Sequence, residues 1–185
     1  IEANIRVVFG VEALSMSSNS EGVELETNQG LIKSVNCIIA TNGFAKQWIE
    51  DDIQPARAQV IVTNEIENLQ VKGTFHYQKG YYYFRNIGNR ILLGGGRNLD
   101  FKGETTESFE TTPQIQQKLE DLMRSTIIPN QNFKIEYSWS GIMGVGDTKS
   151  PILKMLNKNT AIGVRLGGMG VALGSQVGKS LANYF

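Results

Sequence analysis

Two short apolar runs lie far apart in the chain and constrain its fold most strongly. The first, Cys-Ile-Ile-Ala, occupies residues 37–40, and the second occupies residues 161–166, where Arg165 is the one charged residue. A run that is apolar throughout is typical of a strand buried on both faces, as in a parallel central sheet. We therefore predict that residues 1–54 and 156–185 are two pieces of one domain, and that residues 55–155 form a second domain inserted between them.

The inserted segment has the pattern of an antiparallel sheet. Three segments predict strands of this kind: residues 55–63, 81–85 and 90–95. Residues 86–89 predict a hairpin turn between the last two, and Pro113 predicts the first turn of a helix. Residues 135–139 predict a further strand, which a glycine-rich loop follows. The fold class that we expect is α+β, with a mixed, largely antiparallel sheet flanked by pieces of an α/β domain.

The two ends of the chain differ from this middle part. Residues 4–16 read as extended structure, and residues 22–27 alternate apolar and polar side chains, as a half-buried strand does. Near the C-terminus, the glycine-rich residues 167–170 lead into a predicted helix. Gly174 and Gly178 lie on one stripe of this helix, and such small residues would let it lie close against another backbone.

The composition argues against several classes of function. The chain has 18 basic and 18 acidic residues, so it lacks the basic excess with which proteins bind nucleic acids or membrane surfaces. No uninterrupted apolar run reaches the ~20 residues that a membrane span needs. One cysteine, Cys37, and one histidine, His76, allow no intrachain disulfide and no ordinary zinc site. We therefore expect no nucleic-acid partner, no membrane span, no metal and a cytoplasmic location, and we expect a cofactor to carry any catalysis.

The segment of residues 164–171 has the order strand, glycine-rich turn, helix. The N-terminus of a helix presents unpaired N–H groups and a positive dipole end, which stabilise an anion or a polarised carbonyl. The alternative is a tight turn that only packs a helix on a sheet. The segment lacks the G-x-G-x-x-G pattern of a dinucleotide-binding turn.

Two further segments are candidates for a ligand site. Residues 139–151 form a glycine-rich loop directly after an aromatic strand end, which suits either the rim of a ligand site or a long surface connection. Residues 80–85 read Gly-Tyr-Tyr-Tyr-Phe-Arg, and alternation puts Tyr81 and Tyr83 on one face of a strand. This face either lines a pocket or belongs to the hydrophobic core.

The order of five motifs along the chain resembles the D-amino-acid oxidase-like (DAO) family of FAD-dependent oxidoreductases, which includes glycine, sarcosine and γ-glutamylputrescine oxidases. The motifs are Cys-Ile-Ile-Ala-Thr-Asn-Gly (37–43), Pro-Ala-Arg-Ala-Gln (55–59), Tyr-Tyr-Phe-Arg to Leu-Leu-Gly-Gly-Gly (82–96), Trp-Ser-Gly-Ile-Met-Gly (139–144) and Leu-Gly-Gly-Met-Gly-Val (166–171). The likeness covers nearly the whole chain and corresponds to the C-terminal half of the family's proteins.

The resemblance implies a mechanism and a set of cofactor contacts. Members of the family move a hydride from the carbon next to a substrate nitrogen onto the flavin of FAD, and water hydrolyses the resulting imine. The glycine-rich turn matches the loop that faces the flavin, so its N–H groups would stabilise the reduced form. The residues to which the resemblance assigns cofactor contacts are Val11, Thr41, Asn42, Gly43, Leu166, Gly167, Gly168, Met169, Gly170 and Val171.

The resemblance also assigns the substrate side and the partners. Gln59, Tyr83 and Met143 would line the catalytic site for a small amine or amino acid. Residues 55–155 would be the substrate-binding domain, and the flanking pieces would belong to an FAD-binding domain. The N-terminal half with its G-x-G-x-x-G pattern, which cradles the pyrophosphate, would be a partner from the same polypeptide. Without it, we expect the chain to be inactive.

The chain departs from the family pattern at three positions. Met143 stands where amino-acid oxidases place a carboxylate-binding arginine, and Met169 and Ala172 stand where sarcosine-oxidase-like members carry histidine and lysine. A substrate carboxylate would then need a cation from elsewhere, for which Arg57 and Arg165 are the candidates. The alternative function is a non-enzymatic α+β binding or assembly module whose glycines serve only as turns.

Overall fold

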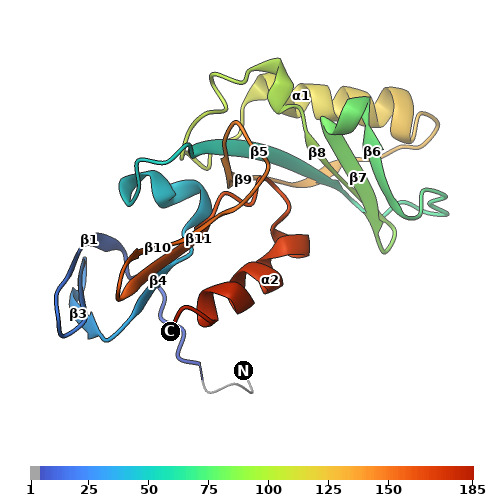
Figure 1. Cartoon of the computed structure of the whole chain (residues 1–185). Helices are drawn as coiled ribbons and strands as arrows, with labels where there is room; N and C mark the ends of the chain where they lie inside the picture. The colour runs from blue at the N-terminus through green and yellow to red at the C-terminus, as the bar shows by residue number, and fades with distance from the viewer. Residues whose placement is uncertain (1–4) are drawn as a thin grey trace. The chain divides into compact units, whose positions relative to one another are not determined.

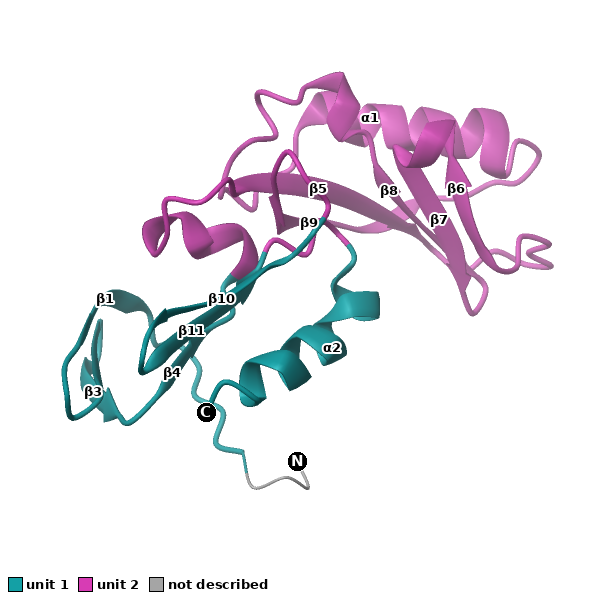
Figure 2. Cartoon of the chain, in the orientation of Figure 1, with its two compact units in different colours: residues 1–41, 150–164, 169–185 teal, residues 42–149, 165–168 magenta. Residues whose placement is uncertain are grey.

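The computed structural model describes residues 5–185, and the chain divides into two compact units (Figures 1 and 2). The first unit comprises residues up to 41 together with residues 150–164 and 169–185, and the second comprises residues 42–149 and 165–168. The turn at 165–168 thus belongs to the second unit, although the strand before it and the helix after it belong to the first. The predicted functional domains, with limits at 54/55 and 155/156, remain a prediction.

The first unit contains a three-stranded antiparallel meander. Its strands are β1 (Ala13–Ser18), β2 (Val23–Thr27) and β3 (Gly30–Ser34), in the order β1-β2-β3. Extended structure was expected from residue 4, but regular pairing begins only at Ala13. Gly22 has a φ of +152°, and a Cβ there would overlap the backbone carbonyl of Ser34, so a close approach of two backbones requires the glycine.

A second sheet in the same unit pairs the two apolar runs of the sequence. It has the order β10 (Ile152–Asn157), β11 (Thr160–Val164), β4 (Cys37–Ile39), and β11 runs parallel to β4, with Thr160 opposite Cys37. Every residue of β11 is buried. The prediction of burial on both faces is wrong for β4 among the described residues, because β4 is an edge strand there and Ile38 is 44% exposed.

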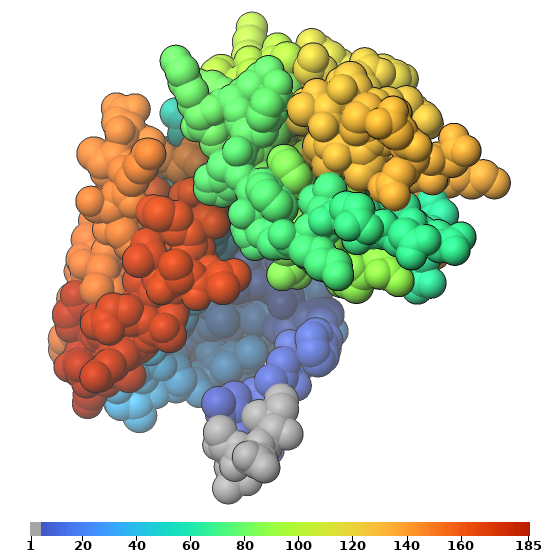
Figure 3. All heavy atoms as spheres, turned by 90° about the vertical axis from the view of Figure 1, so that its right-hand side faces the viewer, coloured from blue at the N-terminus to red at the C-terminus, as the bar shows by residue number. Residues whose placement is uncertain are grey.

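Helix α2 (Gly170–Ala182) packs on this sheet through a glycine of the strand. A Cβ at Gly163 would lie 2.6 Å from Leu181 Cδ1 and 2.9 Å from Val177 Cγ1, so the strand glycine permits the close approach. The sequence assigned this role to Gly174 and Gly178, but among the described residues neither Cβ position has a heavy atom within 4 Å apart from the nearby backbone of the helix itself. Much of α2 therefore lies at the surface, where its atoms are red in Figure 3.

The second unit is a five-stranded antiparallel sheet with a helix on one face. The strand order is β6 (Thr74–Tyr77), β7 (Tyr82–Ile87), β8 (Arg90–Gly95), β5 (Gln54–Thr63) and β9 (Ile135–Val145), which confirms the largely antiparallel sheet. Short helical turns are η1 (Asn42–Gln47), η2 (Gln78–Gly80) and η3 (Arg97–Leu99). Helix α1 (Pro113–Leu122), which the π-helical turn η4 (Met123–Ile127) extends, covers one face and buries Ile61, Leu93, Ile115 and Leu119 (Figure 1).

A buried ion pair joins β5 to the segment that follows β8. Arg57 Nε donates to Glu104 Oε2 over 2.9 Å, and Arg57 Nη2 donates to Glu104 Oε1 over 2.6 Å. The Arg57 backbone N–H also donates to the Glu104 carbonyl over 2.8 Å. Because the side chains of Arg57 and Glu104 are only 6% and 1% exposed, each charge depends on the other for compensation. The hydrogen bond with Glu104 raises the pKa of the Arg57 guanidinium.

Among residues 5–185, no helix is long and apolar enough to cross a membrane. In the same part of the chain, no group of three or more His, Cys, Asp or Glu side chains is placed to hold a metal ion.

Glu104→Ala is expected to lower the free energy of unfolding of the second unit by about 3–5 kcal/mol, because the charge of Arg57 remains buried without a partner. The matched control is Glu120→Ala, which breaks the exposed pair of Glu120 with Arg124 and should cost less than about 1 kcal/mol. Urea unfolding followed by tryptophan fluorescence measures both, since Trp48 and Trp139 lie in this unit. Equal losses in the two variants would contradict this account of the ion pair.

Candidate functional site

The glycine-rich turn at residues 165–168 has an unusual backbone and is fixed to the second unit. Arg165, Gly167 and Gly168 have φ values of +62°, +55° and +83°. The N–H of Leu166 donates to Asn42 Oδ1 over 3.1 Å, and the N–H of Gly167 donates to the Gly144 carbonyl over 3.0 Å. These two N–H groups are therefore already occupied by the protein, and the later N–H groups of the segment are the ones that remain for a ligand.

The segments around Asn42 and Met143 meet the same turn. A Cβ at Gly43 would lie 2.7 Å from Ile142 Cγ2, and a Cβ at Gly144 would lie 2.9 Å from Asn42 Oδ1. Met143 Sδ lies 3.2 Å from the position that a Cβ would take at Gly168. The structure thus brings together six residues predicted for the site, which are Asn42, Gly43, Met143, Leu166, Gly167 and Gly168.

The remaining predicted cofactor residues belong to the first unit. Met169 precedes α2, and no side chain caps the start of this helix. Met169 and Val171 are exposed, and Gly170 is the first residue of α2. An uncapped helix start of this kind keeps its N–H groups and the positive end of the dipole available.

Thr41 and Val11 lie elsewhere in the same unit. Thr41 is an exposed residue that follows β4 after Ala40, and Val11 is half-buried in the segment before β1. Next to Val11, the N–H of Glu12 donates to Asn28 Oδ1 over 3.0 Å, which fixes this segment to the hairpin of β2 and β3. Their contact with a cofactor remains a prediction.

The face of the five-stranded sheet that lies opposite α1 carries Tyr83 and Met143. We call it the open face. Tyr83 pairs with Gly94, Gly94 with Val60, and Val60 with Trp139, so these residues form one row across the sheet. The Tyr83 hydroxyl oxygen lies 2.5 Å from the position that a Cβ would take at Gly94, so the ring lies across the glycine. Burial raises the pKa of the Tyr83 phenol, which therefore stays protonated and can donate a hydrogen bond at neutral pH.

Gln59 lies on the other face of the same sheet. It pairs with Ser140, which is three positions before Met143 on β9, and with Gly95, which is next to Gly94, the partner of Tyr83. Because side chains alternate between the two faces of a sheet, Gln59 points to the face opposite Met143 and Tyr83. Gln59 is 0% exposed, its Nε2 donates to Glu104 and Thr112 Oγ1, and its Oε1 accepts from the Thr112 N–H and Gln116 Nε2. The structure does not bring Gln59 together with Tyr83 and Met143, because its whole amide is used to fix the segment before α1.

Two aromatic residues lie on the open face beside Met143, of which Tyr137 was not predicted for the site and Trp139 was included only as the first residue of the candidate segment 139–151. Tyr137 and Trp139 are 55% and 44% exposed and precede Met143 at alternate positions of β9. The predicted strand ended at residue 139, but β9 continues to Val145 because Gln54 at the start of β5 pairs with that residue. The alternation of Tyr137, Trp139, Gly141 and Met143 was the signal in the sequence that could have shown this.

The two arginines considered for a substrate carboxylate are both committed to internal carboxylates. Arg57 is buried against Glu104, and Arg165 Nη1 lies 3.1 Å from Asp52 Oδ2. The arrangement therefore offers backbone N–H groups, apolar and aromatic side chains and a phenol, and it offers no free cation at these two positions.

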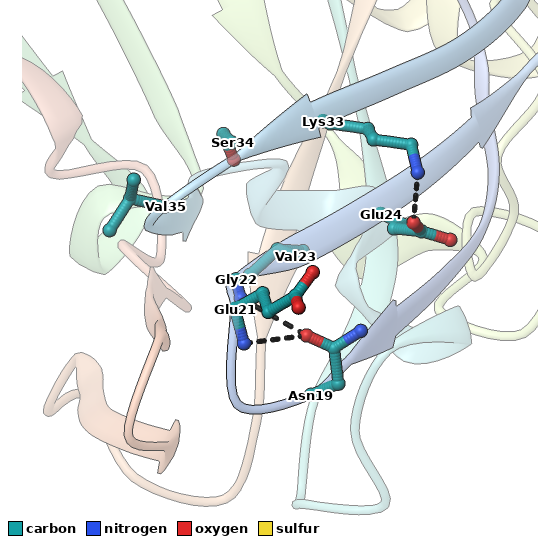
Figure 4. A pocket seen from close by; sticks show the side chains of 8 residues that line it. All are labelled: Asn19, Glu21, Gly22, Val23, Glu24, Lys33, Ser34 and Val35. Atoms are coloured by element: carbon teal, nitrogen blue, oxygen red, sulfur yellow. Dashed lines mark hydrogen bonds and ion pairs between the residues drawn. The ribbon is translucent and has the colours of Figure 1, made fainter.

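A hollow of about 300 Å³ in the first unit is lined by none of the predicted site residues (Figure 4). It is lined by residues of the β1–β2 turn and the facing strands, among them Asn19, Glu24 and Lys33. Asn19 Oδ1 accepts hydrogen bonds from the N–H groups of Glu21 and Gly22, and Lys33 Nζ lies 2.5 Å from Glu24 Oε1. Because these polar groups already bind one another, they do not indicate a ligand for the hollow.

Comparison with solved structures supports the fold. The chain is 17% identical to L-proline dehydrogenase from P. horikoshii, with a TM-score of 0.74. The match covers 94% of this chain and 48% of that one. Glycine oxidase from Geobacillus kaustophilus is 18% identical, with a TM-score of 0.75 and coverage of 94% and 47%. Iminodiacetate oxidase from a Chelativorans species is 18% identical, with a TM-score of 0.71 and coverage of 92% and 47%. The chain spans about half the length of these proteins.

Comparison with sequences gives the family. A search of curated protein sequences finds no match. A family model described as FAD dependent oxidoreductase (DAO) matches residues 1–184, which is nearly the whole chain. The chain therefore belongs to the DAO family of FAD-dependent oxidoreductases.

Proposed function

We propose that this chain provides the substrate-facing sheet and the flavin-facing turn of an enzyme that oxidises a small amine or amino acid at the carbon next to nitrogen. The observation that carries the proposal is the meeting of three segments predicted for the site, residues 42–43, 142–144 and 165–168, within one compact unit. The names of the structural neighbours refer to glycine, proline and iminodiacetate, which are small amino or imino acids.

The residues present fit a flavin in the following way. Gly167 and Gly168 are exposed and have left-handed φ values, so the backbone can approach a flat ring without interference from a Cβ. The first turn of α2 has no side-chain cap, so its N–H groups can bind an anionic or polarised oxygen. When bound, FAD supplies the redox chemistry, because its ring accepts the hydride that leaves the substrate carbon.

Each predicted cofactor residue has a proposed part in this arrangement. We assign the N–H groups from Gly168 to Val171 to the flavin, and we assign Leu166, Gly167, Asn42 and Gly43 to holding the turn in place. Val11 and Thr41 are assigned to contacts with the cofactor, for which the family resemblance is the support. The exposed side chains of Met169 and Val171 would cover the ligand.

The open face is proposed as the wall of the substrate site. Met143 pairs with Ala56 of β5, and Tyr83 is in the row of Val60, four residues further along β5. The strands that carry Met143 and Tyr83, β9 and β7, are three strand spacings apart. The two backbones are therefore ~13 Å apart along the strands and ~14 Å apart across them. A small substrate cannot contact both backbones, so we place Met143 beside the flavin and the Tyr83 hydroxyl at the far wall. Gln59 is assigned a structural role beneath this wall, because its amide is fully occupied on the opposite face.

The proposed partner is the remaining part of the same polypeptide, with a G-x-G-x-x-G turn for the pyrophosphate. Two features of the first unit support it. β4 pairs only with β11 among the described strands, so its other edge presents backbone groups with which a further strand can pair. Ile38 and Val35 are 44% and 69% exposed beside this edge, so apolar surface is available for further elements.

The whole protein is expected to show flavin absorbance in the visible range, which a primary or secondary amine bleaches under anaerobic conditions. The measurement is an anaerobic titration with a panel of small amines and amino acids. Reversal of the bleaching on admission of air or an artificial acceptor is the control for damage to the protein. A colourless whole protein that takes up no added FAD would defeat the proposal and favour a non-enzymatic module.

Gly168→Asp is expected to slow reduction of the flavin by substrate at least about tenfold relative to Gly168→Asn. The two side chains have nearly the same shape and both tolerate a left-handed backbone, so the difference isolates one negative charge placed where negative charge develops on the ring. Stopped-flow reduction at saturating substrate measures the rates. The same rate in both folded variants would show that the turn does not face the flavin.

Met143→Arg is expected to improve the use of a carboxylate-bearing substrate. Relative to Met143→Gln, the KM for an amino acid should fall about tenfold, since a guanidinium forms a charge-assisted pair with a carboxylate. The KM for the corresponding amine without the carboxylate is the internal control and should not fall. Equal changes for both substrates would place Met143 away from the substrate.

A further inference from the structure

Arg165 has a backbone conformation that its residue type disfavours. Its φ of +62° lies in the left-handed region, where a Cβ is crowded and where glycine is the usual residue. The other left-handed positions of this turn, Gly167 and Gly168, are glycines. A residue with a side chain stays in such a conformation only when its surroundings hold it there, so the side chain of Arg165 needs an explanation.

The guanidinium of Arg165 ties together three separate segments of the second unit. Its Nη1 donates to the Asp52 carbonyl over 2.7 Å and to Asp52 Oδ2 over 3.1 Å, and its Nη2 donates to Thr148 Oγ1 over 2.9 Å. Asp52 Oδ2 also accepts from the N–H of Asp147 over 2.7 Å. A Cβ at Gly146 would lie 2.9 Å from Arg165 Cδ, so the stem of the arginine lies directly on that backbone.

The guanidinium end of these contacts is sheltered, whereas the carboxylate end is open to solvent. The Arg165 side chain is 12% exposed, whereas that of Asp52 is 43% exposed. The planar fork of a guanidinium binds a carbonyl, a carboxylate and a hydroxyl at the same time, which a lysine ammonium cannot reproduce in the same geometry. The donors that point to Asp52 and Thr148 are not available to a substrate carboxylate.

We infer that Arg165 is a positioning residue: its bonds to Asp52 and Thr148 hold the turn of residues 165–168 in its left-handed conformation. This conformation in turn sets the direction of the Gly168 N–H, which follows Gly167 within the same unit. The first part of the inference concerns the protein alone. The second part, that the fixed turn presents its N–H groups to FAD, rests on the proposed function.

The two hydrogen bonds next to Arg165 give a direct readout of the turn. The N–H groups of Leu166 and Gly167 are bound to Asn42 Oδ1 and to the Gly144 carbonyl. Their hydrogen exchange reports how often the turn opens, whether or not a cofactor is bound. Loss of the Arg165 clamp should therefore increase exchange at these two amides while the amides of β5 and β8 keep their protection.

The decisive variant is Arg165→Gly in the whole protein, with Arg165→Lys beside it. Glycine adopts a positive φ without steric cost. If position 165 had only to adopt this conformation, the Leu166 and Gly167 amides would exchange as slowly in Arg165→Gly as in the wild type. If the guanidinium holds the turn, Arg165→Gly speeds exchange of the Leu166 and Gly167 amides at least about tenfold, and Arg165→Lys restores only part of the protection. The control is Arg124→Ala, which removes an exposed arginine paired with Glu120. Alanine is chosen there because glycine would interrupt a helical turn.

FAD binding separates this inference from the proposed function. Arg165→Gly is expected to bind FAD about 10- to 100-fold more weakly and to alter the fine structure of the visible flavin bands, whereas Arg124→Ala changes neither. Wild-type exchange at Leu166 and Gly167 in Arg165→Gly would overturn the positioning role. If exchange rises but the affinity for FAD is unchanged, the turn is held by Arg165 but does not present its N–H groups to the cofactor, which overturns the second part. A wild-type protein that binds no FAD defeats the proposed function, and the exchange result still decides the first part.

Discussion

The alternation of side chains along β5 is the constraint on which the rest of the second unit depends. This strand pairs with β8 on one side and with β9 on the other, so its two faces set the faces of the whole sheet. Arg57, Gln59 and Ile61 point toward α1 and are buried, whereas Ala58 and Val60 point to the open face. A shift of one residue would bring the charge of Arg57 to the open face and take Ile61 out of the core. The register of β5 thus separates the structural side of the sheet from the side proposed for substrate.

The buried pair of Arg57 and Glu104 helps to fix that register. Its stabilising contribution need not be large, because the desolvation of two charges offsets much of their attraction. Its effect on specificity is greater, since any other register would leave Glu104 buried without its arginine. Gln59 adds to this by binding the Glu104 carboxylate and the Thr112 backbone together, which sets where α1 begins. The segment between β8 and α1 is therefore placed by polar contacts, and the core beneath α1 then forms around it.

Parts of the fold that depend on local chemistry could be predicted from the sequence. The turn at residues 86–89 and Pro113 at the start of α1 both follow from turn and helix-start preferences, and both are found in the structure. The apolar runs at 37–40 and 161–166 also indicated that the two ends of the chain share one domain, and β4 and β11 do pair in the structure, although the sequence did not predict that pairing and β4 is an edge strand there.

What depended on distant partners could not be predicted. Polar residues at alternate positions of β5 suggest an exposed face, and they are buried only because Glu104 lies 47 residues further along the chain. The end of β9 depends on pairing with the start of β5, and the close approach of α2 depends on Gly163 in place of the helix glycines. At the site, the resemblance in the order of motifs pointed to Asn42, Met143 and Gly168, whereas nothing in the residue type of Arg165 indicates a left-handed backbone.

The chemistry of the candidate site explains why so few of its residues stand out in the sequence. A redox cofactor brings its own reactivity, so the protein has to supply position, shape and electrostatic potential. In the arrangement proposed for this chain, the potential would come largely from backbone N–H groups, which every residue type except proline carries. The segment is distinguished by the hydrogen bonds that fix its backbone. The N–H groups of Leu166 and Gly167 donate to Asn42 and Gly144, and the guanidinium of Arg165 donates to Asp52 and Thr148. Side chains that hold a backbone in place can be distant in sequence and ordinary in type, so the geometry of the turn is more informative about function than its composition.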